Sequence, residues 1–217
     1  ARIVLLHRGS QDKSALLLST LPGSGHGALI ASVTDSAQLA QAAQDVADHY
    51  GPATILVNCA GHTKPIPAAN LDALDDALID EMFAANWRGT FATIRAFVPQ
   101  MQTTGDALIV NVSSIAANTG LGSNLAYAAA KAGIDALTKG LAKTLAPKIR
   151  VLAVSPGVVD SPFVSGRDAQ FNAKTGATIA LQRVGNPDDV AAAIAACCTS
   201  LRYATGSIFT VDGGRHL

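Results

Sequence analysis

Residues 111–131 read NVSSIAANTGLGSNLAYAAAK, and this stretch decides how the chain folds. The run that enters it, Leu108–Val112, is apolar and β-branched and has the length of a buried strand. Its last residues, Ala126–Lys131, are helix formers, and the helical pattern continues to Pro147. The stretch therefore predicts a strand, a loop and a long helix.

Tyr127 and Lys131 stand four residues apart, so on a helix they lie on the same face, one turn apart. A free tyrosine has a pKa near ~10, and a nearby cation lowers it by favouring the phenolate. We therefore expect Tyr127 to exchange a proton with a carbonyl or alcohol oxygen. Ser114, at the end of the strand, supplies a second hydroxyl for the same oxygen. The alternative is an ordinary amphipathic helix pair beside serines that merely end a strand.

Strand-like and helical runs alternate along the rest of the chain. We expect further strands at 2–6, 27–33, 54–57, 149–154 and 207–211, and helical segments at 11–21, 35–50, 71–102 and from 186 onward. This alternation predicts a parallel sheet with helices on both faces. Residues 158–181 are the least regular stretch, and we expect them to form a mobile lid over a substrate.

Composition limits the class of protein. The chain has 217 residues, enough for one well-buried domain, and 49% of them are hydrophobic against 15% charged. Its formal net charge is zero, and no basic stripe suggests nucleic acid or an anionic membrane surface. No apolar run has the length of a membrane span. Cys59, Cys197 and Cys198 have neither zinc nor disulfide spacing, so we expect reduced, mostly buried thiols in a cytoplasmic protein and no metal.

Several short motifs occur in a fixed order around this stretch. They are Asn58-Cys-Ala-Gly61 after a strand, Asn86 within Ala85-Asn-Trp-Arg-Gly89, the Ser114, Tyr127 and Lys131 set, Ser155-Pro-Gly157 after another strand, and Val211-Asp-Gly-Gly214. In these motifs the chain resembles the short-chain dehydrogenase/reductase family in its compact form, over essentially its whole length. The resemblance implies an α/β fold, a Rossmann-type doubly wound parallel sheet, and one NAD(P)-binding reductase domain over residues 1–217.

The resemblance also implies roles for single residues. The catalytic set is Asn86, Ser114, Tyr127 and Lys131. In the family the asparagine distorts its helix and holds a water that continues a proton relay toward the lysine, and the lysine binds the nicotinamide ribose. The alternative for Asn86 is a polar residue that faces solvent.

The cofactor expected from this resemblance is NADP(H) rather than NAD(H). The strand that in such folds binds the adenine ribose ends in His7-Arg8-Gly9-Ser10, which lacks a carboxylate and offers a guanidinium for the 2′-phosphate. The expected cofactor-binding residues are Arg8, Ser10, Val33, Asn58, Ala60, Gly61, Tyr127, Lys131, Pro156, Gly157, Val159 and Ser161. By resemblance Val159 offers its amide to the nicotinamide carboxamide. Two positions depart from the family, since Ser32 replaces an adenine-binding aspartate and Cys59 replaces an asparagine.

The family's glycine-rich phosphate loop is absent from the sequence. Gly23-Ser-Gly-His-Gly27 precedes a strand instead of following one, which is the wrong context for a pyrophosphate. We therefore expect roughly one strand and one helix, about 25 to 30 residues, upstream of Ala1. Without them the first two strands would be separated from the others. The alternative is a complete chain that cannot bind a dinucleotide in the usual way.

These expectations combine into one function. We expect an NADPH-dependent oxidoreductase that interconverts a carbonyl and an alcohol, or reduces a related C=N or C=C bond, on a small-molecule carbonyl or pterin-like substrate. Similar sequences include 3-oxoacyl carrier-protein reductases and pteridine reductases. Relatives imply a homotetramer or homodimer joined through the helices at 84–102 and 124–146 and through the C-terminal strand. The alternative from another class is a non-catalytic nucleotide-binding or interaction protein that retains the fold.

Overall fold

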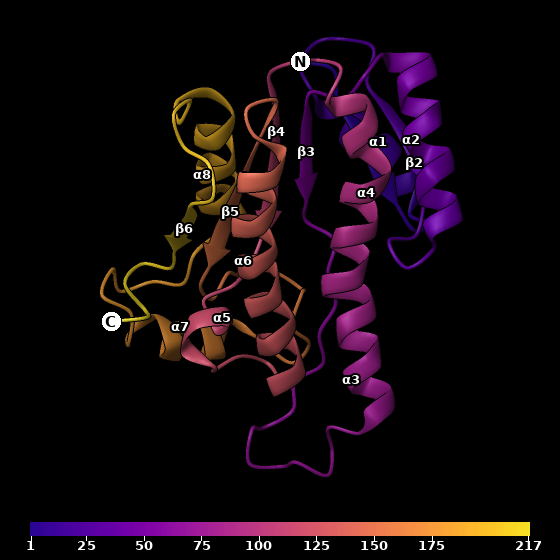
Figure 1. Ribbon diagram of the computed structural model, residues 1–217. Coiled ribbons are helices and arrows are strands. Elements are labelled where there is room, and N and C mark those ends of the chain that lie inside the picture. Colours follow the sequence, from indigo (N-terminus) through magenta and orange to yellow (C-terminus); the bar gives the residue numbers. More distant parts are fainter.

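The computed structural model describes all residues, 1–217, and Figure 1 shows its helices and strands. The strands are β1 (Val4–His7), β2 (Gly27–Ile30), β3 (Ile55–Asn58), β4 (Ala107–Val112), β5 (Ile149–Pro156) and β6 (Ile208–Val211). The α-helices are α1 (Gln11–Thr20), α2 (Ser36–Tyr50), α3 (Asp76–Phe83), α4 (Gly89–Met101), α5 (Ala116–Thr119), α6 (Leu125–Leu145), α7 (Ala169–Gly176) and α8 (Pro187–Thr199), and a π-helical turn, η1, spans Ala84–Arg88.

The strands form two parallel sheets. One has the order β3-β4-β5-β6 and the other pairs β1 with β2. As expected, the first two strands are separated from the rest, so β1 and β3 each lack a neighbour on one side. On β3 the side chains of Ile55 and Val57 are 45% and 40% exposed, although strands of parallel sheets are usually covered on both faces. The strand and helix expected upstream stay a prediction.

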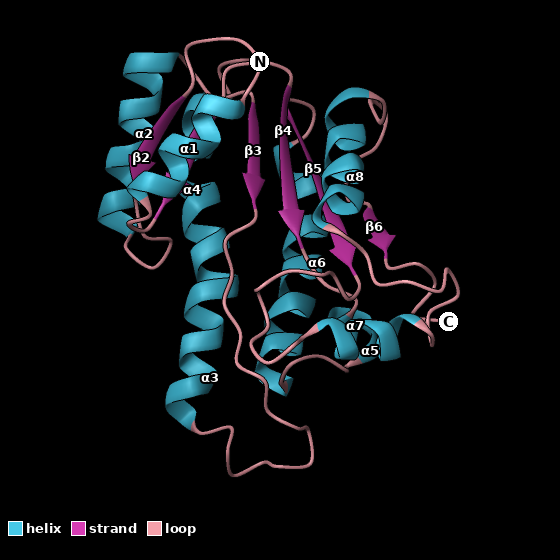
Figure 2. Cartoon of the chain, turned by 180° about the vertical axis from the view of Figure 1, so that it is seen from behind, coloured by secondary structure: helices cyan, strands magenta, loops and turns pink.

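Helices cover both faces of the larger sheet, as the alternating pattern predicts (Figures 1 and 2). On one face, β4 and β5 pack through residues such as Ile109 and Val151 against α4 and α6. On the other face, Val110 and Leu152 pack against α8 around Cys197. The fold is thus an α/β sandwich of helix, parallel sheet and helix, which is the Rossmann-type arrangement expected from the sequence.

Two segments differ from their expected form. The helix expected over 71–102 begins only at Asp76, where the Asp75 side chain accepts a hydrogen bond from Leu78 N, and it is interrupted by η1. The stretch expected to be irregular, 158–181, contains α7, which begins after Asp168 because that side chain caps it. The capping hydrogen bond stabilises a short helix there in spite of the glycines in this stretch.

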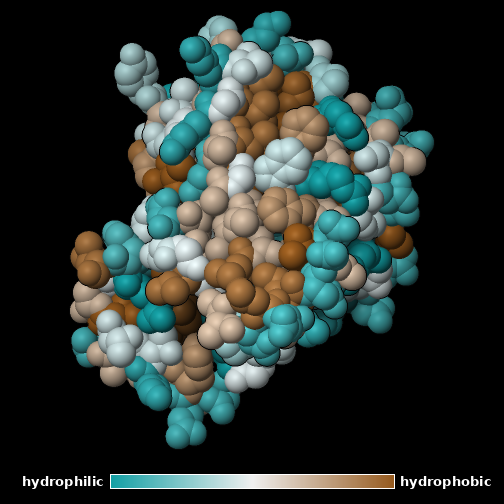
Figure 3. All heavy atoms as spheres, turned by 60° about the horizontal axis from the view of Figure 1, so that its bottom comes forward, coloured by the Kyte–Doolittle hydropathy of each residue, from teal (hydrophilic) through white to brown (hydrophobic).

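All four strands of the larger sheet end on the same side, the lower side in Figures 1 and 2. The loops that follow them, with α5 and α7, gather at this edge. Figure 3 views the molecule from below and shows a band of apolar residues between hydrophilic rims. Ligands of parallel α/β sheets bind at this edge, so it is where a site is sought. No helix combines the length and the hydrophobicity that crossing a bilayer requires.

Candidate active site

The structure brings Ser114, Tyr127 and Lys131 together at the carboxyl edge of the sheet. Ser114 follows the end of β4, and its hydroxyl accepts a hydrogen bond from Ala116 N at 3.2 Å. Tyr127 lies in the first turn of α6 and Lys131 one turn later. The Lys131 ammonium is 5.7 Å from the centre of the Tyr127 ring, and the Ser114 hydroxyl is close enough to lower the pKa of the phenol by hydrogen bonding. The three groups predicted to act together therefore lie in one site.

The expected net lowering of the Tyr127 pKa is wrong for this structure. Burial of the phenol raises its pKa to about 12, and the opposing effects of the Ser114 hydrogen bond and the Arg167 charge are smaller. Only 8% of Tyr127 is exposed, so loss of water around the phenolate outweighs nearby positive charge. The spacing of two residues in sequence could not reveal this burial.

Lys131 is also buried, with 4% of its surface exposed. Burial lowers its pKa to about 8, while the charges of Cys59 and Asp135 act in the opposite direction. Its ammonium donates a hydrogen bond to the Val112 carbonyl at 2.7 Å. Lys131 is thus held by the strand that leads to Ser114, and it still carries its charge at neutral pH.

The segment 158–181 covers the phenol. Phe163 packs against the Tyr127 ring with 6.1 Å between ring centres. Farther along, the Arg167 guanidinium stacks 5.0 Å from the centre of the Phe171 ring, and its charge reaches Tyr127. This is the segment expected to form a lid, although its mobility stays a prediction.

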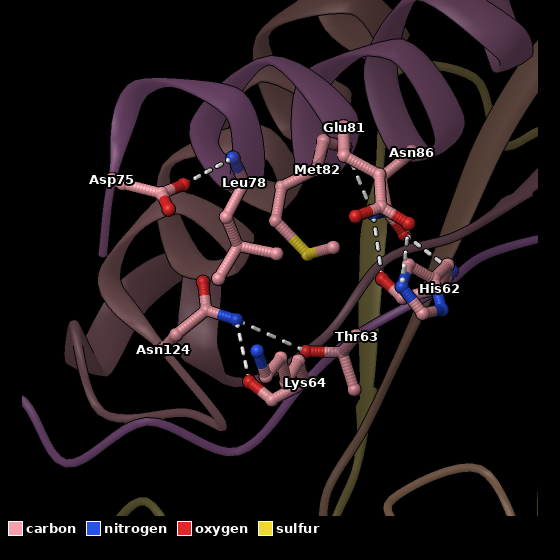
Figure 4. A network of polar contacts seen from close by, with 9 residues as sticks. All are labelled: His62, Thr63, Lys64, Asp75, Leu78, Glu81, Met82, Asn86 and Asn124. Atoms are coloured by element: carbon pink, nitrogen blue, oxygen red, sulfur yellow. Dashed lines mark hydrogen bonds and ion pairs between the residues drawn. The ribbon is translucent and has the colours of Figure 1, made fainter. Parts of the chain in front are cut away.

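Asn86 lies in η1, and its surroundings exclude the solvent-facing alternative because it is completely buried. Its side-chain oxygen accepts a hydrogen bond from His62 N at 3.2 Å, and its amide nitrogen donates to the carbonyls of His62 at 2.8 Å and Met82 at 2.9 Å (Figure 4). The helix is distorted here, as expected from the resemblance. The side-chain nitrogen is fully bonded within the protein, and the main-chain carbonyl of Asn86 accepts a hydrogen bond from Thr90 Oγ1 at 2.7 Å. The relay water stays a prediction.

The residues expected at the nicotinamide end lie after β5. A Cβ atom added at Gly157 would lie 2.6 Å from Asp212 Cβ, so the close approach of these two segments requires glycine. The carbonyl of Pro156 accepts a hydrogen bond from Ile115 N at 3.0 Å. Val159 pairs with Gly185, but both hydrogen bonds of this bridge use Val158 and Asp160, which leaves the Val159 amide free to bind a ligand. Ser161 follows two residues later on the same segment.

Asn58, Ala60 and Gly61 follow β3. The Asn58 side chain turns inward and donates to Asn111 Oδ1 at 2.9 Å, so it holds β3 to β4. Ala60 and Gly61 are exposed. A Cβ atom at Gly61 would lie 2.9 Å from Asn86 Oδ1, so glycine allows the chain to pass close to η1.

Arg8, Ser10 and Val33 follow the two strands of the smaller sheet. In the turn after β1, His7 Nδ1 accepts hydrogen bonds from Gly9 N and Ser10 N at 3.3 and 3.1 Å. Arg8 and Ser10 are exposed there, and no ion pair holds the Arg8 guanidinium. Val33 packs against Gly89 at the start of α4, where an added Cβ would lie 2.9 Å from Val33 Cγ2.

Sequence reasoning missed two residues near Tyr127. Asn124 caps α6 and accepts a hydrogen bond from Tyr127 N at 2.7 Å, and an asparagine just before a helical run is a signal that could have identified it. Arg167 had no such signal, since its position beside the site depends on the path of a long loop. The expectation of mostly buried thiols fails at Cys59, which is exposed.

Two other features of the structure lie away from this set. An open recess of about 300 Å³, lined by residues including Ala146, Ile149 and Tyr203, contains none of the predicted site residues. No three histidine, cysteine or acidic side chains gather closely enough to hold a metal ion.

Comparison with known proteins agrees with the motifs and the fold. The family described as enoyl-(acyl carrier protein) reductase matches residues 1–216. The 3-oxoacyl-(acyl-carrier-protein) reductase of Thermotoga maritima is 34% identical over 85% of this chain and 75% of its own length. Carbonyl reductase family member 4 of Danio rerio is 34% identical over 100% of this chain and 88% of its own. The solved structure of a short-chain dehydrogenase/reductase of the glucose/ribitol dehydrogenase type from Brucella melitensis superposes with a TM-score of 0.90 at 27% identity, covering 100% of this chain and 87% of that one. The chain therefore belongs to the short-chain dehydrogenase/reductase family of oxidoreductases.

Proposed function

We propose that this protein is an NADPH-dependent reductase that converts a carbonyl group into an alcohol. The observation that carries the proposal is the meeting of the Ser114 hydroxyl, the Tyr127 phenol and the Lys131 ammonium at the carboxyl edge of the sheet. A phenol whose pKa is about 12 stays protonated at neutral pH, so it is available as a proton donor.

Each residue of the site has a part in the proposed reaction. Ser114 donates a hydrogen bond to the carbonyl oxygen and holds it beside the phenol. Tyr127 transfers its proton to that oxygen as negative charge develops there. The ammonium of Lys131 stabilises the phenolate that remains, and Asn86 holds the water through which the proton is replaced. The bound cofactor supplies the hydride.

Several features of the chain fit a nicotinamide dinucleotide. The free amide of Val159 suits the carboxamide, next to Pro156, Gly157 and Ser161. Lys131 would bind the ribose beside it. On the smaller sheet, the exposed Arg8 and Ser10 suit a 2′-phosphate, and this choice of NADP(H) over NAD(H) is part of the proposal.

The proposed substrate is a small-molecule carbonyl or pterin-like compound, of the 3-oxoacyl or pteridine-reductase type. The exposed Phe163 beside Tyr127 would give its binding region an apolar wall. We also propose a cytoplasmic enzyme that assembles as a homotetramer or homodimer.

Oxidation of NADPH tests the proposal most simply. The full natural protein is mixed with NADPH and a panel of ketones, acetoacetyl thioesters and dihydropteridines, and absorbance at the nicotinamide band is followed. Turnover on at least one class, faster with NADPH than with NADH, is the expected result. A non-catalytic protein that retains the fold is the rival. Absence of turnover on every class, together with no rise in Tm on adding NADPH, would favour that rival.

A further inference from the structure

Residues 62–66, here named the strap, lead away from Gly61 and are held at both ends by buried asparagines (Figure 4). At one end the side chain of Asn86 bonds both the amide and the carbonyl of His62. At the other end the side-chain amide of Asn124 donates to the Lys64 carbonyl at 2.8 Å and to Thr63 Oγ1 at 3.4 Å. The strap therefore connects η1 with the start of α6.

The side chain of Asn124 forms hydrogen bonds with two different parts of the chain. Its oxygen accepts a hydrogen bond from Tyr127 N at 2.7 Å and so fixes the first turn of α6. Its nitrogen holds the strap, and only 3% of the residue is exposed. The neighbouring Ser123 adds further bonds to the strap, because its hydroxyl contacts Thr63 Oγ1 and its carbonyl accepts from Ile66 N at 2.6 Å. A movement of the strap is therefore transmitted to the turn that carries Tyr127.

Apolar packing joins the same parts. Ile66 of the strap, Met82 before η1, and Tyr127 are all members of one buried cluster. Ile66 is 8% exposed and Met82 is completely buried, so the strap cannot shift without opening this cluster. The hydrogen bonds of Asn124 and the packing of Ile66 thus both hold the strap to the buried cluster that contains Tyr127.

We infer that Asn124 is a positioning residue for Tyr127, because one buried amide fixes both the backbone of the phenol's helical turn and the strap packed against it. This inference rests on the proposed function. The orientation of a proton donor controls the rate of its transfer, and a misplacement of about 1 Å can cost roughly a hundredfold. Asn124 would therefore affect kcat more than binding of the cofactor, since it is not among the residues proposed to bind it.

Two substitutions separate the two hydrogen-bonding roles of Asn124. Asn124→Ser keeps an oxygen that can cap the helix but removes the amide donor to the strap. Asn124→Ala removes both. Asp75→Ala is the matched control, since Asp75 likewise caps a helix through the amide three residues later, at Leu78 N and 2.8 Å, and contacts none of the proposed catalytic groups.

Hydrogen exchange of backbone amides and steady-state kinetics are measured on all three variants. In Asn124→Ser we expect faster exchange in peptides that cover 62–66 and no change over 125–128, with kcat lowered roughly tenfold or more and KM for NADPH nearly unchanged. In Asn124→Ala both segments should exchange faster and kcat should fall further. Asp75→Ala should keep the wild-type exchange in both segments and the wild-type kcat.

Different outcomes contradict different claims. If Asn124→Ser leaves exchange of the strap unchanged, its amide does not anchor the strap and the inference is wrong. If the strap is released but kcat stays at the wild-type value, Asn124 supports the fold without positioning Tyr127. A wild-type protein without turnover would contradict the proposed function instead, and the exchange data would then still decide whether Asn124 couples the strap to α6.

Discussion

At the scale of single residues, the central physical feature is the ammonium group of Lys131, a residue only 4% exposed, beside a buried phenol. Lys131 is held there by one hydrogen bond to the Val112 carbonyl. Removing an ammonium from water disfavours its charged form, which is why the pKa of Lys131 falls to about 8. Burying this charge therefore lowers the stability of the fold, and it places a cation beside the position where a phenolate would form.

Lys131→Met tests this cost through the pH dependence of stability. An unfolded lysine keeps its proton up to about 10.4, whereas Lys131 in the fold loses it near pH 8, so between these values the unfolded state binds more protons. The free energy of unfolding of the wild type should therefore increase as the pH rises across this window, because the folded protein no longer has to bury a charged Lys131. Urea unfolding at pH 7 and pH 10 should show this rise, and Lys131→Met should lack it. An equal rise in both proteins would contradict the buried charge.

Arg8 provides a second prediction at this scale. If its guanidinium binds the 2′-phosphate, Arg8→Ala should raise KM for NADPH roughly tenfold or more, since a charge-assisted hydrogen bond is worth about 1.5–3 kcal/mol. KM for NADH, which lacks that phosphate, is the internal control and should hardly change. The same increase with both cofactors would show that Arg8 does not select between them.

At the scale of elements, η1 shapes the site. A regular α-helix through 76–101 would bond every carbonyl to the amide four residues on, but the π turn frees room for the Asn86 side chain to reach His62. Because Asn86 is buried, the polar groups it bonds would be left without partners if it were removed. The distortion is therefore maintained by the contact that it makes possible.

Asn86→Ala should accordingly destabilise the protein by about 2–4 kcal/mol, because it leaves the amide and carbonyl of His62 and the Met82 carbonyl without these bonds. The free energy of unfolding in urea measures the effect. Gln44→Ala is the control, since its bond to Asp48 on α2 is exposed, and it should change stability by less than about 0.5 kcal/mol. A similarly small change in Asn86→Ala would mean that these bonds hardly stabilise the fold.

The type of nearly every element was predictable from sequence, since periodicity and turn residues carry local information. The strands and helices at 27–30, 36–50 and 149–156 lie where their patterns place them. Two features needed tertiary information. Burial raises the Tyr127 pKa, and the path of the loop at 158–181 brings Arg167 to the phenol, whereas the cap at Asp168 that starts α7 is a local signal that sequence reasoning overlooked. Sequence spacing identified the groups of the site but not their solvation.

At the scale of the whole molecule, the prediction concerns the number of copies that assemble. The proposed tetramer or dimer would pack through α4 and α6, and Gly140 on α6 is a useful probe because a Cβ atom there meets nothing within 4 Å in the same chain. Gly140→Arg should therefore leave the fold of each chain intact but disrupt a close helix contact between copies. Light scattering after gel filtration should give a multiple of 22.1 kDa for the wild type and a smaller mass for the variant. A wild-type mass of one chain would contradict the proposed assembly.

The most direct test of the proposed reaction removes a single oxygen atom. Tyr127→Phe keeps the ring that packs against Phe163 and in the buried cluster, so the fold and the cofactor site should be preserved. Binding of NADPH, followed by its fluorescence, and the rate of NADPH oxidation with the best substrate are measured on the same sample. We predict a Kd close to that of the wild type and loss of turnover by at least roughly a hundredfold, since a proton donor contributes about 10²–10⁴. Turnover at the wild-type rate would remove Tyr127 from the mechanism and contradict the proposed active site.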